Sequence, residues 1–97
     1  MVFAPLLISV ALAGGAMTTH GLERALLANG AVAPTCRPAT AAERAAGPFG
    51  RRGRLFSCRM TIDGERARYD VQVVGERCFV AERHHRGRAL YGCRPRA

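Results

Sequence analysis

The chain has 97 residues, a formal net charge of +8 and fifteen basic residues, every one of them arginine. This length allows a single domain and excludes a multidomain architecture. The basic balance favours an anionic partner such as nucleic acid, an acidic envelope polymer or a membrane surface, while the absence of lysine also fits a GC-rich codon bias.

Residues 2–13 form an uncharged apolar run that is too short for a membrane span, which needs about 20 residues. Small residues follow and offer a cleavage site. We therefore expect residues 1–16 to be a signal peptide or N-terminal apolar segment, and residues 17–97 to form a secreted or cell-envelope domain. Cleavage would leave no stable membrane span. Because no Lys or Arg precedes the apolar run, an uncleaved anchor and a start codon placed too late stay open.

Two helical segments are predicted before the sheet. Thr18 or Thr19 can cap a short helix that ends before Gly30, a residue suited to the position after a helix. Residues 39–46 are predicted to form one or two helical turns. Between the two, residues 34–38 carry a cysteine flanked by prolines, which predicts an extended or turning segment.

From Arg54 onward apolar and polar residues alternate with a period of two, as in strands. Asp63-Gly64 is a strong hairpin signal, and Gly75-Glu76 fits a two-residue type II′ turn. Two more strands are predicted over 77–83 and 88–93. The predicted fold class is α+β, with one short helix packed on a four-stranded antiparallel meander and two disulfides.

Two-residue turns fix the register of every cross-strand pair. The first places Cys58 opposite Tyr69, and the second places Val71 opposite Val80. The third, centred between His85 and Arg86, places Val80 opposite Tyr91. These registers put nearly all of one apolar set on one face of the sheet. Glu82 is the exception.

The four cysteines contain no Cys-x-x-Cys pair, which argues against zinc or a thioredoxin-like motif and favours disulfides. In the predicted meander Cys78 and Cys93 are directly opposite each other. Cys58 is too far from both, because at least one strand separates them. The predicted bridges are therefore Cys36–Cys58 and Cys78–Cys93, each worth roughly 3 kcal/mol. They require an oxidising compartment.

The same registers predict a row of arginines on the other face of the sheet. Arg59 opposes Arg68, Arg68 opposes Arg83, and Arg83 opposes Arg88. Like charges placed opposite each other destabilise a sheet, so the row either splays into water or binds an anion. The guanidinium fork suits phosphate and carboxylate oxygens.

The predicted partner of this row is an anionic polymer or an acidic protein surface. Nucleic acid is disfavoured, because Phe79 is the one aromatic residue placed beside the arginines to stack a base. The alternative is a solvated, codon-biased surface without a ligand.

No residue pattern points to catalysis, to a metal site or to a cofactor. His84 and His85 lie in a predicted turn without a third ligand at the right spacing. A nuclease-like enzyme would need these histidines, whereas a protease inhibitor would use the basic loop 47–54, which presents Arg51 or Arg52. The leading hypothesis is a non-enzymatic exported module.

Cys36-Arg37-Pro38, Phe56-Ser57-Cys58, Asp63-Gly64 and the strand 69–74 together resemble a family of small exported actinobacterial domains of unknown function. The resemblance covers roughly residues 20–82 and departs from the family in Arg37, in a longer first loop and in the additional Cys78 and Cys93. It implies secretion, a helix-plus-sheet fold and a Cys36–Cys58 bridge, and no activity.

Overall fold

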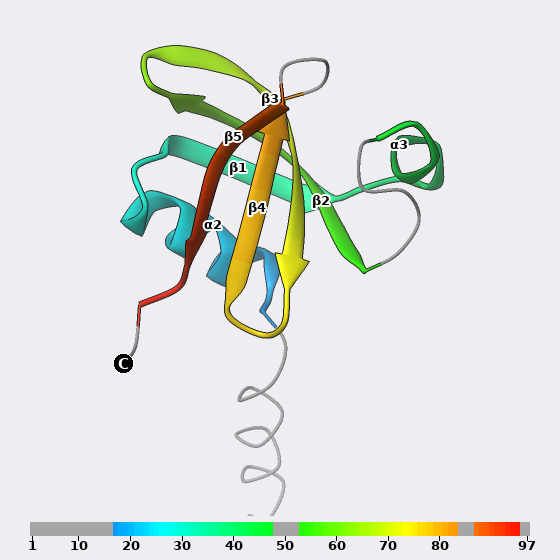
Figure 1. The fold of residues 1–97 in the computed structure, drawn as a ribbon, viewed down its shortest axis with the longest axis horizontal. Coiled ribbons are helices and arrows are strands. Elements are labelled where there is room, and N and C mark those ends of the chain that lie inside the picture. The colour runs from blue at the N-terminus through cyan, green and yellow to red at the C-terminus, as the bar shows by residue number, and fades with distance from the viewer. Residues whose placement is uncertain (1–16, 48–52, 84–86, 96–97) are drawn as a thin grey trace, which may run out of the picture.

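A computed structural model describes residues 17–47, 53–83 and 87–95, with the backbone alone for residues 87–89. Its helices and strands are, in chain order, α2 (Thr19–Ala28), β1 (Val32–Pro38), α3 (Ala41–Ala46), β2 (Arg54–Ile62), β3 (Glu65–Val74), β4 (Cys78–Arg83) and β5 (Gly87–Cys93). The strands form one five-stranded antiparallel sheet in the order β1-β2-β3-β4-β5 (Figure 1).

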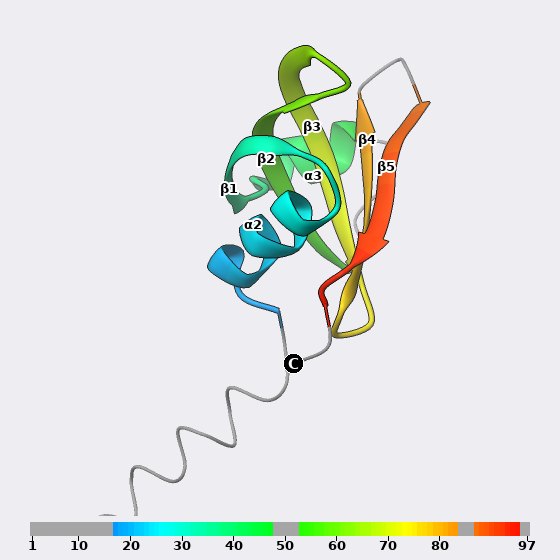
Figure 2. The ribbon, with the colours of Figure 1, turned by 90° about the vertical axis from the view of Figure 1, so that its left-hand side faces the viewer.

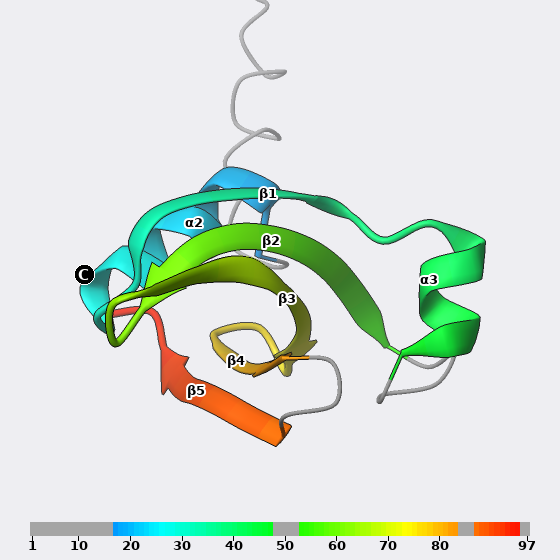
Figure 3. The same cartoon turned by 90° about the horizontal axis from the view of Figure 1, so that it is seen from above.

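The sheet is strongly curved, and α2 packs on one of its faces (Figures 2 and 3). We call this the inner face and the opposite one the outer face. The helix contacts both edge strands, β1 and β5. The short helix α3 stands beyond the ends of β1 and β2, away from α2 (Figure 3).

The helix α2 begins and ends as the sequence predicts. The Thr18 hydroxyl accepts a hydrogen bond from the Gly21 amide at 2.9 Å, which satisfies one of the free amides of the first turn. At the other end Gly30 has a φ of 106°, a conformation that favours glycine. Leu22 and Leu26 are fully buried against the sheet.

The core fills the space between α2 and the inner face. It consists of Met17, Leu22, Ala25, Leu26, Ala31, Cys36, Phe56, Cys58, Met60, Ile62, Tyr69, Val71, Val73, Phe79 and Ala81. Each large side chain buried in this way contributes about 1.5–3 kcal/mol of hydrophobic stabilisation.

The predicted count of four strands and one helix is wrong by one element of each kind. Residues 39–46, predicted as a helical turn or two, form α3 with Thr40 as its N-cap. The additional strand is β1, which pairs with β2 so that Cys36 lies opposite Cys58. Its two prolines lack amide donors, and a sheet tolerates such residues at an edge, which is where β1 lies.

The first hairpin has the predicted register, with Cys58 opposite Tyr69. The second is wrong by one residue, because Val74 and not Val73 lies opposite Cys78, and the connection therefore has three residues. A shift of one residue turns every side chain of a strand to the other face. Phe79, predicted on the outer face, is accordingly fully buried on the inner face.

The third hairpin keeps the predicted pairs Cys78–Cys93 and Val80–Tyr91 close to its open end. An irregularity between Ala81 and Glu82 then shifts the pairing by one residue. Since β4 is turned over relative to the prediction, these predicted inner-face pairs lie on the outer face, and Tyr91 is 58% exposed.

Both predicted disulfides are confirmed: Cys36 is bonded to Cys58 and Cys78 to Cys93. The first lies in the core and ties β1 to β2. The second lies on the outer face and ties β4 to β5. Two disulfides fit an extracytoplasmic location. Within the described ranges no helix has the length and apolar character to cross a membrane, and the predicted segment 1–16 lies outside these ranges.

Candidate anion-binding site

The predicted row of four arginines does not form. Arg59 and Arg68 are cross-strand neighbours on the outer face, as predicted. Arg83 does not follow them, because the one-residue shift of β4 places it on the inner face, in phase with Phe79. Arg88 lies opposite Glu82 and not Arg83, and its side chain is outside the described part of the chain.

Arg83 is used structurally at the edge of the core. Its Nη1 lies 2.6 Å from Oε1 of Glu65, and its side chain is 26% exposed. Glu65 begins β3 and shares the inner face with Tyr69. Arg83 is therefore neutralised within the fold and does not continue the cationic surface of the outer face.

A different set of arginines gathers on the outer face of β1, β2 and β3. They line a pocket of about 340 Å³ together with Thr35, Cys36 and Ser57. We call these four residues the outer arginine cluster: Arg37 from β1, Arg59 from β2, and Arg66 and Arg68 from β3. Three adjacent strands thus present positive charge to one shallow space.

Glu43 of α3 is the counter-ion of one side of this cluster. Its carboxylate accepts hydrogen bonds from Arg37 at 2.8 and 2.7 Å and from Arg68 at 3.2 Å. It also closes a capping box by accepting from the Thr40 amide, while its own amide donates to the Thr40 hydroxyl. The two parallel hydrogen bonds from Arg37 to Glu43 are among the stronger contacts that arginine makes.

These contacts lower the pKa of Glu43 to about 2, chiefly through the hydrogen bond from Arg37 and then that from the Thr40 amide. The same ion pair raises the pKa of Arg37. The carboxylate therefore stays ionised well into acid. The contacts of Glu43 show that the arginines of this surface bind an oxyanion within the folded protein.

The remaining arginines of the cluster differ in how firmly they are held. Arg68 also donates to the Ser57 hydroxyl at 3.3 Å and lies 3.5 Å from the Asp70 carboxylate. Arg66 donates to the backbone carbonyl of Ala33 at 3.1 Å. Arg59 is exposed, and among the described residues its guanidinium group has no hydrogen-bond or ion-pair partner. Arg59 is thus the position at which an external anion meets the least competition.

We expect Glu43→Gln to lower the thermal midpoint at neutral pH, because it removes the charge that Arg37 and Arg68 share. The depressed pKa of Glu43 means that this stabilisation is complete above its ordinary value of 4.5 and is lost as the pH falls toward about 2. The midpoints of the wild type and the variant, measured from pH 7 to pH 2, should therefore converge in acid. A difference that stays constant down to pH 2 would contradict this assignment.

One member of the cluster escapes sequence reasoning. Arg37 has no predicted position, because its segment is not predicted to be a strand. Its position follows once Cys36 is set opposite Cys58, since Arg37 then lies opposite Ser57. Arg66 lies two residues from Arg68 on the same face of β3, so the alternation already places it next to the predicted row.

Other predicted candidates lie outside the described residues: His84 and His85, and Arg51 and Arg52 of the basic loop. In the ranges that the structure covers, no group of three His, Cys, Asp or Glu side chains could hold a metal ion. Comparison of the chain with protein-family models, curated proteins and solved structures gave no match. The resemblance to exported actinobacterial domains stays a prediction.

Proposed function

We propose that this chain is a non-enzymatic exported module that binds an anionic polymer or an acidic protein surface through the outer arginine cluster. The observation that carries the proposal is Arg59, an exposed arginine that has no partner among the described residues and lies beside three others at one pocket. Guanidinium groups bind phosphate, sulfate and carboxylate oxygens with a fixed two-pronged geometry.

The contact between Arg37 and Glu43 supports the choice of ligand chemistry. It is an internal example of a carboxylate held by two nitrogens of this surface at 2.8 and 2.7 Å. Because Glu43 engages Arg37 and Arg68, the charge left for a partner lies on the side of Arg59 and Arg66. A repeating polyanion or an acidic segment can run across that side and meet several guanidinium groups in turn.

We expect the double variant Arg59→Ser/Arg66→Ser to elute from a heparin column at clearly lower salt than the wild type. A hydrogen bond to a charged group is worth about 1.5–3 kcal/mol, but salt screens exposed charges. A loss of affinity of about tenfold for the pair is therefore the expected size. Affinity measured by titration with a soluble polyphosphate should fall to the same extent.

The matched control is Arg51→Ser/Arg52→Ser, which removes the same charge and changes none of the described residues that line this pocket. It should elute close to the wild type. Glu43→Gln should elute later, because it releases the charge of Arg37 and Arg68. Equal losses in both double variants would mean that net charge alone causes retention, and would overturn the proposed site.

A further inference from the structure

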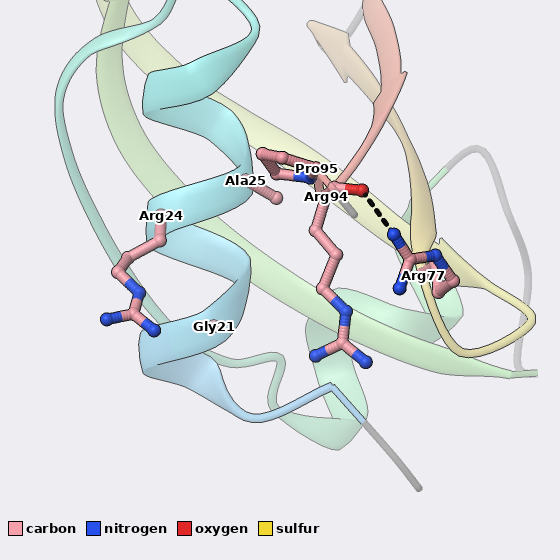
Figure 4. Close-up of a pocket in the computed structure, with 6 residues that line it drawn as sticks. All are labelled: Gly21, Arg24, Ala25, Arg77, Arg94 and Pro95. Carbon is pink, nitrogen blue, oxygen red and sulfur yellow. Dashed lines mark hydrogen bonds between the residues drawn. The ribbon is translucent and has the colours of Figure 1, made fainter. Parts of the chain in front are cut away.

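A second pocket, of about 480 Å³, lies between α2 and the C-terminal end of β5 (Figure 4). The start of α2 and the end of β5 meet at the same end of the molecule (Figures 1 and 2). Among the described residues six line the pocket: Gly21, Arg24, Ala25, Arg77, Arg94 and Pro95. None of them belongs to the outer arginine cluster, and none is acidic.

The disulfide of the outer face joins the two chain segments that carry Arg77 and Arg94 at this pocket. Arg77 precedes Cys78 and Arg94 follows Cys93, so the Cys78–Cys93 bond brings these two arginines side by side. Their backbones are joined by a hydrogen bond from the Arg94 amide to the Arg77 carbonyl at 2.7 Å. The Arg77 side chain donates in return to the Arg94 carbonyl at 2.9 Å. Arg77 and Arg94 are thus held together by a covalent bond and two hydrogen bonds.

The charges at this pocket are not balanced within the part of the chain that the structure describes. The Arg77 side chain donates a hydrogen bond to a backbone carbonyl, which carries no formal charge, so the charge of Arg77 stays uncompensated. The side chains of Arg24 and Arg94 make no hydrogen bond or ion pair with any described residue. In Figure 4 Arg77 and Arg94 lie on the same side of α2, whereas the Arg24 side chain leaves the helix on the other side. Keeping the like charges of Arg77 and Arg94 side by side costs free energy unless water or an anion compensates them.

The rest of the lining is nonpolar and has little bulk. Gly21 and Ala25 lie one turn apart on α2 and face Pro95 across the pocket (Figure 4). Ligand pockets of this size are commonly nonpolar with a few polar groups that set the orientation. The lining therefore fits a molecule with an anionic head and a nonpolar body.

We propose that this pocket binds a phosphoryl group carried on a small or amphipathic organic molecule. The dianionic phosphoryl oxygens contact Arg77 and Arg94, and the nonpolar body rests on Gly21, Ala25 and Pro95. Two arginines match the double charge of a phosphate monoester better than the single charge of a carboxylate. This inference does not depend on the proposed function, because the two pockets share no residue.

Phenyl phosphate is the probe for the test, with inorganic phosphate and benzyl alcohol as probes of the head and the body alone. We expect calorimetric titration to give tighter binding for phenyl phosphate than for either. Amide shifts in NMR spectra should be centred on Ala25 and Arg94. The variant Arg94→Ser should weaken binding at least about tenfold, the size of one lost charge-assisted hydrogen bond.

The control is Arg24→Ser, which removes the same charge on the other side of α2 and should change phenyl phosphate binding little. Both disulfides and an otherwise unchanged amide spectrum show that a variant is folded. Phosphatidic acid vesicles, whose headgroup is a phosphate monoester, test the source: cosedimentation that Arg94→Ser abolishes indicates a lipid headgroup, whereas binding of phenyl phosphate alone indicates a soluble ester. No binding of either probe, or losses in Arg24→Ser equal to those in Arg94→Ser, would overturn the inference.

Discussion

Replacing Phe79 by alanine is expected to destabilise the protein by about 3–5 kcal/mol. Phe79 is the largest fully buried side chain of the domain and lies opposite Val73 on the inner face. Its removal takes a whole ring out of the core and leaves a cavity that the disulfide-bonded sheet cannot close. A domain of about 80 residues has a total stability of only about 4–12 kcal/mol, so the variant should be partly unfolded at 37 °C.

The matched control is Val80→Ala, which changes the next residue of β4. Val80 is half-buried on the outer face, and we expect a loss of about 1 kcal/mol or less. Urea denaturation of both variants, followed by circular dichroism, gives the two free energies. A larger loss of stability for Val80→Ala than for Phe79→Ala would contradict the observed register of β4. It would support the two-residue turn predicted at Gly75-Glu76.

The parts of the fold that local chemistry determines follow from the sequence. At the first hairpin Asp63 and Gly64 have φ values of 51° and 81°, and both residues tolerate this left-handed region. The turn type then fixes all pairs between β2 and β3, including Arg59 with Arg68. The cap of α2 at Thr18 is equally local, because it depends on one hydroxyl and one amide.

The second hairpin is less determined, because Gly75 with a φ of 67° serves a connection of two or of three residues. Two misfits of the predicted register pointed to the error: Glu82 on the apolar face and Phe79 outside it. A shift of one residue corrects both. It also turns Arg83 inward, and only the ion pair with Glu65 makes that position acceptable. This long-range contact is not readable from alternation alone.

The strand β1 could not be predicted from periodicity, since prolines interrupt it and Ala33 has a φ of 51°. The candidate site was incomplete for the same reason. Without β1 the one cross-strand neighbour of Ser57 in the predicted sheet is Asp70 of β3, and Arg37 has no position. Glu43 then appears as one residue of a short helix, although it is the main counter-ion of the surface.

The core disulfide is expected to stabilise the protein more than the outer one. In the chain-entropy model the two contribute alike, about 3 kcal/mol each, because their sequence separations of 22 and 15 residues differ little. Their surroundings differ. Cys58 is fully buried and Cys36 is 9% exposed, whereas both cysteines of the other bridge are half-buried. Removal of the core bridge therefore adds a packing loss to the entropic one.

The double variants Cys36→Ala/Cys58→Ala and Cys78→Ala/Cys93→Ala separate these terms. We expect a loss of about 4–5 kcal/mol for the first and about 3 kcal/mol for the second, measured by urea denaturation without reductant. The first loss should include separation of β1, because an edge strand with two prolines has few amides to hold it to β2 and depends on the sulfur link. Faster hydrogen exchange confined to β1 would support this dependence. Equal losses in the two variants would mean that loop entropy alone governs both bridges and that packing around Cys58 contributes little.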